Sequence, residues 1–369
     1  MPLSPDHLST WITGKALPLW TGVGIDAATG TCWTALDHAG APCVDMARRM
    51  RVQTRQAYCF AQSDLPAHRA LALQLFRFSV DHGFDPETGN LVATTHPDLS
   101  VLSAPHDLYD MAFTLLAASA LIEAGAEISA DLARLEAELA RLDAPRGWYE
   151  DAAQAAAPAG ARRRQNPHMH MFEATTALWR ATGEARFAAM ADKSLGLFRD
   201  VFLQPDGRVF EYFDLDWRPV DLTEQAVEPG HMVEWVYLLD QWEKVSGTSC
   251  GVDLRKVFEA ARGSADAAGT ALPDTAMPLS EARRCWPQTE FLKAAVSLRA
   301  RGALAAEDAE LPEAILAALW ADYVDVEVPG GWYDSRRVSD RALLSDRMPA
   351  STFYHLFMAF QHYIAERSG

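Results

Sequence analysis

Six prolines recur along the chain at almost constant spacing, and each one opens an apolar run that is typical of a helix. The separations between successive members are 63, 62, 62, 58 and 62 residues. Chance could align two or three of the 20 prolines, but the shared context at all six positions indicates an internal repeat. The members are Pro42, Pro105, Pro167, Pro229, Pro287 and Pro349. Six such units account for nearly all of the 369 residues.

A second helical pattern lies between successive prolines. These segments carry charges on one side and Leu, Ala or Phe on the other, as helices with one face in water do. The proline-led segments are apolar and aromatic throughout, as buried helices are. The amphipathic segments are 5–19, 65–82, 128–142, 184–201, 253–263 and 308–323. The sequence therefore predicts an all-α fold, a closed (α/α)6 barrel with six inner and six outer helices, in one domain over residues 1–369.

The connections that lead into the inner helices are long and rich in Gly, Asp and aromatic residues, which predicts turns and short strands. They include 83–90, 147–151, 205–214 and 330–335. The connections in the other direction are much shorter. All six inner helices should therefore begin at one rim, where their N-termini surround a deep cavity with partial positive charge.

Composition excludes several classes of protein. The formal net charge of −17 makes binding to nucleic acid improbable. We expect no membrane span, because no stretch approaches the roughly 18 apolar residues that one requires. The residues MPLSPDHLSTWITGK show no secretory signal. The five cysteines are scattered, which favours free thiols in a reducing compartment and a cytoplasmic protein.

Three histidines from three different inner helices, His170, His231 and His355, can approach one cavity at the rim. His168 should be packed or act in capping instead, because on a helix it diverges from His170 by about 200°. These two therefore cannot share a metal, and we expect none. Asn166 suits an N-cap, with Pro167 in the first helical position. No phosphate-binding loop or dinucleotide fingerprint is present, so we expect no cofactor.

Imidazoles that face one cavity suit proton transfer at a carbon next to a carbonyl. Glu234, three residues after His231, is expected to hold the tautomer of that ring. Arg55 could stabilise a developing oxyanion, or form an internal ion pair, and it reaches the rim only if its helix begins after Pro42. Further candidates for the cavity wall, from the starts of the second and fifth helices, are Tyr109, Trp286, Gln288 and Glu290.

These residues resemble the N-acylglucosamine 2-epimerase family, whose members fold as (α/α)6 barrels. The resemblance covers most of the chain, through RQAYCFA (55–61), LYDMAF (108–113), QNPHMHMFEA (165–174), EPGHMVEW (228–235), CWPQTE (285–290) and STFYHLF (351–357). It implies that His231 and His355 are the two acid/base catalysts. It also implies that the sugar hydroxyls or the reacting carbonyl are contacted by Arg55, Tyr109, Asn166, His170 and Glu234.

Within this family the CWPQTE form, together with Asn166 and His170, looks most like the mannose isomerase branch. The resemblance thus implies metal-independent interconversion of D-mannose, or a related hexose, with D-fructose through a cis-enediol(ate). A sugar 2-epimerase acting on N-acylglucosamine or cellobiose is the alternative. Both reactions begin with proton removal at C2. We expect a free hexose as the partner, and a monomer or homodimer.

Two readings from other classes stay open. An (α/α)6 barrel can house a glycoside hydrolase that works with two carboxylates, for which the candidates are Glu234, Glu290, Asp110 and Asp334. The chain could also be a catalytically silent scaffold that binds a sugar or a protein.

Overall fold

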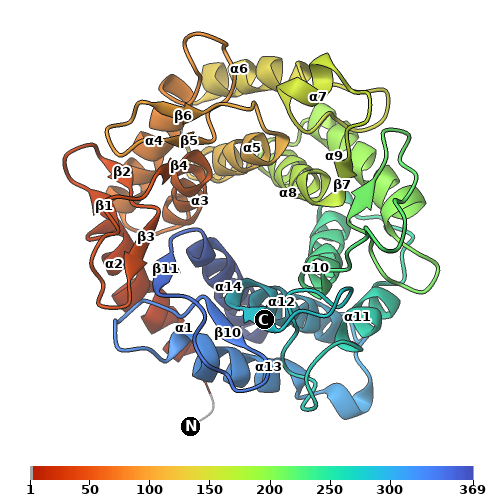
Figure 1. The fold of residues 1–369 in the computed structure, drawn as a ribbon. Coiled ribbons are helices and arrows are strands. Elements are labelled where there is room, and N and C mark those ends of the chain that lie inside the picture. Colours follow the sequence, from red (N-terminus) through yellow and green to blue (C-terminus); the bar gives the residue numbers. More distant parts are fainter. Residues whose placement is uncertain (1–2, 369) are drawn as a thin grey trace.

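The computed structural model describes residues 3–368, and it consists of two concentric rings of helices (Figure 1). Each inner helix contacts the next one along the chain, and the last contacts the first, so the ring is closed. The inner helices are α3 (Met50–Ala61), α5 (Leu108–Glu123), α8 (Gln165–Thr182), α10 (Pro229–Ser246), α12 (Cys285–Ala300) and α14 (Thr352–Ser368). The predicted (α/α)6 barrel is confirmed.

The outer helices bury one face only. In α6 (Ser129–Ala140) the buried residues are Leu132, Leu135 and Leu139, spaced by three and four, whereas α5 buries almost every residue from Leu108 to Leu121. Three outer helices end in, or pass through, a π-helical turn: η1 (Ile12–Ala16), η2 (Phe198–Phe202) and η4 (Trp320–Val324). The other outer elements are α1 (Pro5–Trp11), α2 (Leu17–Thr21), α4 (Pro66–Asp81), α9 (Ala185–Leu197), α11 (Leu254–Arg262) and α13 (Leu311–Leu319). The short α7 (Ala152–Ala156) and the 3-10 turn η3 (Ala306–Asp308) lie in connections.

Short antiparallel strands form in the rim connections, as predicted, and several run directly into an inner helix. β4 (Arg48–Arg49) precedes α3, β7 (Arg163–Arg164) precedes α8, and β9 (Ala282–Arg284) precedes α12. Each pairs with a strand of another connection, so neighbouring repeats are tied together at the rim. The other strands are β1 (Ile25–Asp26), β2 (Thr31–Cys32), β3 (Ala35–Asp37), β5 (Thr94–Thr95), β6 (Val101–Ser103), β8 (Tyr212–Phe213), β10 (Ser335–Arg337) and β11 (Arg347–Pro349).

The two ends of the described chain meet where the barrel closes. β11 pairs with β3, and the red α1 lies beside the blue α14 in Figure 1. A buried aromatic stack joins the first and last repeats: Trp20 packs on Trp332 with ring centroids 4.7 Å apart, and Trp332 packs on Phe353 at 6.1 Å. No helix among residues 3–368 is long and apolar enough to cross a bilayer. The cysteines are unpaired.

Several expectations about helix starts were wrong. α3 begins at Met50, eight residues after Pro42, because the connection continues through β4 before the helix starts. α5 and α14 likewise begin three residues after Pro105 and Pro349. Arg55 therefore lies in the second turn of α3 and reaches the rim. Asn166 does not cap α8: the helix begins at Gln165, with Arg164 at the N-cap position. The side chain of Asn166 is free to face the cavity instead.

Candidate active site

A cavity of about 370 Å³ opens at the rim where the inner helices begin, and all six inner helices contribute to its wall. Eight of the ten residues predicted from the sequence line it, and Gln288 and Glu290 do not. The lining residues are Arg49, Arg51, Arg55, Tyr109, Asn166, His170, Glu228, His231, Glu234, Arg284, Trp286, Asp334, Pro349, Ser351, Thr352 and His355. The wall is strongly polar, as a site for a hydroxyl-rich ligand requires.

His231 is held by two carboxylates, neither of which is Glu234. Its Nδ1 lies 3.0 Å from Oε1 of Glu211 and 3.5 Å from Oε2 of Glu228. Nε2 of Gln165 donates hydrogen bonds to both oxygens of Glu211, which fixes that carboxylate. Burial favours the neutral ring, but the carboxylates of Glu211 and Glu228 outweigh it and raise the pKa of His231 to about 10. His231 is therefore an imidazolium at neutral pH.

His355 lies across the cavity in the opposite protonation state. Its Nδ1 is 2.8 Å from Oε1 of Glu290, and the other oxygen of Glu290 is ion-paired with Lys293 at 2.6 Å. Burial, together with the positive charges of Arg55 and Lys293, holds the pKa of His355 well below its usual range. The indole of Trp286 contacts both histidines, with ring centroids 5.2 Å from His231 and 5.6 Å from His355.

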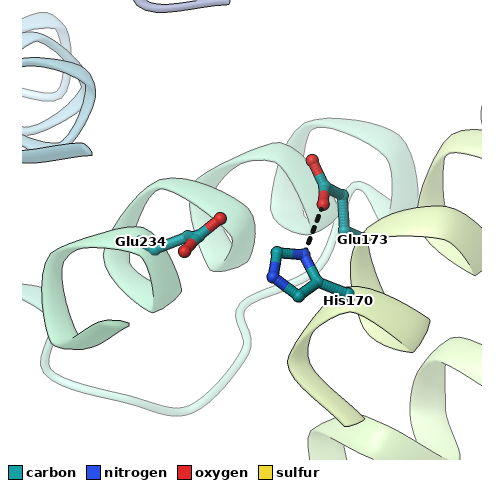
Figure 2. Close-up of side chains that lie close together, drawn as sticks. All are labelled: His170, Glu173 and Glu234. Carbon is teal, nitrogen blue, oxygen red and sulfur yellow. Dashed lines mark hydrogen bonds and ion pairs between the residues drawn. The ribbon is translucent and has the colours of Figure 1, made fainter. Parts of the chain in front are cut away.

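A third histidine forms a cluster with two carboxylates (Figure 2). Nδ1 of His170 is 3.0 Å from Oε2 of Glu173, and the hydroxyl of Tyr354 donates a hydrogen bond to Oε1 of Glu173. Burial lowers the pKa of His170 to about 4 despite this carboxylate, so the ring is neutral. In Figure 2 the carboxylate of Glu234 points from α10 toward His170.

Glu234 is nearly fully buried at the cavity wall, and neither of its oxygens has a hydrogen-bond partner among the described residues. Burial and the neighbouring charge of Glu290 raise the pKa of Glu234 well above its usual range. The expected role of Glu234, to orient His231, is thus taken by Glu211. A buried carboxyl group without a partner is instead suited to bind a ligand hydroxyl.

The guanidinium of Arg55 is directed by aromatic side chains. Its Nη2 donates to the hydroxyl of Tyr109 at 2.8 Å, and its Cζ lies 4.0 Å from the ring centroid of Phe113. The sequence left open whether Arg55 forms an internal ion pair. In the structure it is Arg51 that does so, with its Nε 2.7 Å from Oδ1 of Asp110. Arg55 therefore presents its charge to the cavity.

Gln288 has a structural role, in contrast to the substrate contact expected from its position. Its Oε1 accepts from the backbone N–H of Leu272, and its Nε2 donates to the carbonyl oxygens of Leu272 and Arg284. Gln53, also the fourth residue of its helix, clamps the backbone of Cys32 in the same way. His168, fourth in α8, contacts the backbone of Trp148, which confirms that it is packed.

We therefore expect Gln288→Ala to lower the free energy of unfolding by about 1 to 3 kcal/mol, because it leaves buried backbone groups without partners. Urea unfolding followed by circular dichroism measures this. Gln241→Ala is the control, since Gln241 is only part-buried and bonds its neighbour Asp240. Equal stability of the two variants would contradict the structural role.

Three clusters of described residues bring possible metal-ligand atoms within 4.8 Å of one another. They are His170, Glu173 and Glu234; Glu211, Glu228 and His231; and Glu234, Glu290 and His355. In all three clusters Nδ1 of the histidine is already paired with a carboxylate of the same cluster. In the cluster with Glu290, the buried ammonium group of Lys293 would also repel a second cation. We therefore assign no ion to these clusters.

Sequence reasoning missed four of the charged residues that hold the histidines, namely Glu211, Glu228, Glu173 and Lys293. The last three carried a signal, because each lies three residues from its partner: Glu228 from His231, Glu173 from His170, and Lys293 from Glu290. That spacing places side chains on one helix face. Glu211 lies 20 residues before His231, in a connection, and carried no such signal.

The sequence is similar to those of known sugar epimerases and isomerases. Residues 31–359 match the family described as N-acylglucosamine 2-epimerase (GlcNAc 2-epimerase). A protein of Rhizobium meliloti (strain 1021) named mannose-6-phosphate isomerase is 34% identical over 378 residues, which cover 97% of this chain and 96% of that protein. A D-mannose isomerase of Thermobifida fusca is 28% identical over 231 residues, or 57% of this chain and 56% of that protein.

Two solved structures share the fold. The crystal structure of a D-mannose isomerase has a TM-score of 0.84 at 20% identity, with 98% of each chain covered. Cellobiose 2-epimerase from Spirochaeta thermophila DSM 6192 has a TM-score of 0.82 at 22% identity, with 99% of this chain and 96% of that chain covered.

Proposed function

The chain belongs to the N-acylglucosamine 2-epimerase family, and we propose that it is a metal-independent aldose–ketose isomerase that interconverts D-mannose, or a related hexose, and D-fructose. The broader class, a sugar isomerase or epimerase, is shared with the relatives it matches. One observation carries the finer proposal: two buried histidines face one polar cavity, His231 against the carboxylates of Glu211 and Glu228, and His355 against a carboxylate that is itself ion-paired with Lys293.

In this mechanism neutral His355 takes the proton from C2 of the open-chain aldose, while the His231 imidazolium gives its proton to the carbonyl oxygen O1. The product of that step is a cis-enediol. His231, now neutral, then takes the proton from O2 as His355 returns its proton to C1, which yields the ketose and restores both rings. Arg55 is placed to stabilise the partial charge on the oxygens, and the N-termini of the inner helices add to it.

The environment of His231 supports isomerisation over epimerisation. An epimerase of this design needs each of two groups to exchange a proton with C2, from opposite faces. Two carboxylates hold the proton of His231 firmly, which suits exchange with an electronegative oxygen better than delivery to carbon. The names of the two curated relatives also support an isomerase.

Incubation with D-mannose in D₂O, without added metal or nucleotide and followed by proton NMR, tests this proposal. We expect fructose that carries deuterium at C1. Glucose with deuterium at C2 as the early product would replace the isomerase by the epimerase. Mannose 6-phosphate should be tested in parallel, because one relative is named mannose-6-phosphate isomerase. Arg49 at the cavity wall forms no ion pair among the described residues, so it is available to a phosphate group. Exchange with neither sugar would contradict the proposal.

A further inference from the structure

Lys293 is a fully buried cation that does not line the cavity. It projects from α12, is 0% exposed, and forms its ion pair with Glu290 at 2.6 Å. Its ammonium group also lies 4.2 Å from the ring centroid of Tyr237, and the carboxylates of Glu234 and Glu173 add to its electrostatic environment. A buried ammonium is costly unless it is paired, so its presence directly behind a reactive histidine calls for a role.

The two histidines of the cavity differ in what stands behind their carboxylates. Behind His231, Glu211 is held by the neutral amide of Gln165, so its negative charge acts on the ring in full. Behind His355, Glu290 has one oxygen on the ring and the other on Lys293. The cation thus offsets the charge of the same carboxylate that orients the imidazole.

We propose that Lys293 is a positioning residue that decides which histidine is the base: it neutralises Glu290, so that His355 stays uncharged, donates Nδ1–H to that carboxylate and keeps Nε2 available toward the cavity. The inference rests on the proposed function for its catalytic meaning, but its structural content, the charge state of His355, does not depend on any substrate.

The groups that face His355 from the surrounding helices fix the sign of the effect. They are Arg55 from α3, His170 and Glu173 from α8, Glu234 from α10, and Glu290 and Lys293 from α12. Arg55 and Lys293 are the two cations in this set, against three carboxyl groups. Removal of Lys293 leaves Arg55 alone against them, and the proton affinity of His355 must rise.

The test is an NMR titration of the histidine rings in the full chain labelled with ¹³C and ¹⁵N histidine. His355→Asn assigns the signal. In the wild type we expect His355 to stay neutral from pH 6 to 9, with the proton on Nδ1. In Lys293→Gln, which keeps a donor near Glu290, we expect its proton affinity to rise at least about tenfold, that is, a midpoint at least about one pH unit higher. Lys244→Gln, an exposed lysine of α10, is the control and should change nothing.

Several results would overturn the proposal. One is a protonated His355 in the wild type at neutral pH, a measurement that needs no variant. Another is an unchanged titration in Lys293→Gln and in Lys293→Met, even if both lose activity, because a merely structural lysine would behave so. If neither D-mannose nor its phosphate is a substrate, the titration still decides the role of Lys293. If the substrate is confirmed, the low-pH limb of the kcat/KM profile of Lys293→Gln should move to higher pH by the same amount as the titration midpoint of His355.

Discussion

Replacement of His355 by asparagine is expected to lower kcat/KM for conversion of D-mannose to D-fructose by about 10² to 10⁴-fold, the usual contribution of a general base. Asparagine retains a donor for Glu290 but offers no basic nitrogen to the cavity. Because proton removal from C2 opens the reaction, deuterium exchange at C2 should fall by the same factor. Coupled assay of fructose and proton NMR in D₂O measure the two quantities.

The control for this variant lies on the same helix. His362 of α14 is also buried, but its Nε2 is 3.0 Å from the hydroxyl of Ser297, and it does not line the cavity. His362→Asn should therefore leave kcat/KM within a few fold of the wild-type value. C2 exchange at the wild-type rate in His355→Asn, with the fold intact by circular dichroism, would show that another group is the base.

The architecture could be predicted from the sequence because the barrel repeats a single unit. The period of the prolines and the contrast between apolar and amphipathic helices are set by burial, which leaves a strong trace in composition. The helix starts were harder to place. A proline is tolerated both in the first turn of a helix and in an extended segment before it, so Pro229 lies in the first position of α10 whereas Pro42 lies eight residues outside α3.

The cavity-facing histidines could be predicted because they lie near helix starts, where the repeat itself indicates a common rim. The groups that set their charge could not all be found in this way. Glu211 comes from a connection, directly before β8, and the pairing of β7 with β8 helps to place it beside α8 and α10. Gln288 has the residue type of a ligand-binding side chain, but its repeat position is that of Gln53, a backbone clamp. For such a residue, only the packed structure distinguishes a side chain that contacts the substrate from one that binds the backbone.

The second large effect concerns His231 and its pH dependence. Glu211→Gln removes the nearer of the two carboxylates and leaves Glu228 at 3.5 Å. The pKa of His231, raised to about 10 in the wild type, should then fall, so the acid is lost at lower pH. We expect the high-pH limb of the kcat/KM profile to move to lower pH, with about a twofold loss of kcat/KM at pH 9 if the pKa falls by one unit and about a tenfold loss if it falls by two.

Glu211→Gln should also lower the free energy of unfolding, by an amount that depends on pH. The folded-state pKa of His231 lies above its unfolded value of roughly 6.5, so the ion pair contributes fully below that pH, and its contribution is lost as the pH rises toward about 10. The difference in free energy of unfolding between wild type and Glu211→Gln should therefore be largest near pH 6 and shrink toward pH 10. Glu150→Gln is the matched control, because Glu150 is a buried carboxylate paired with Arg164 and with no histidine. A high-pH limb that stays in place in Glu211→Gln would mean that His231 is not held charged by this carboxylate, and the acid of the reaction would have to be sought elsewhere.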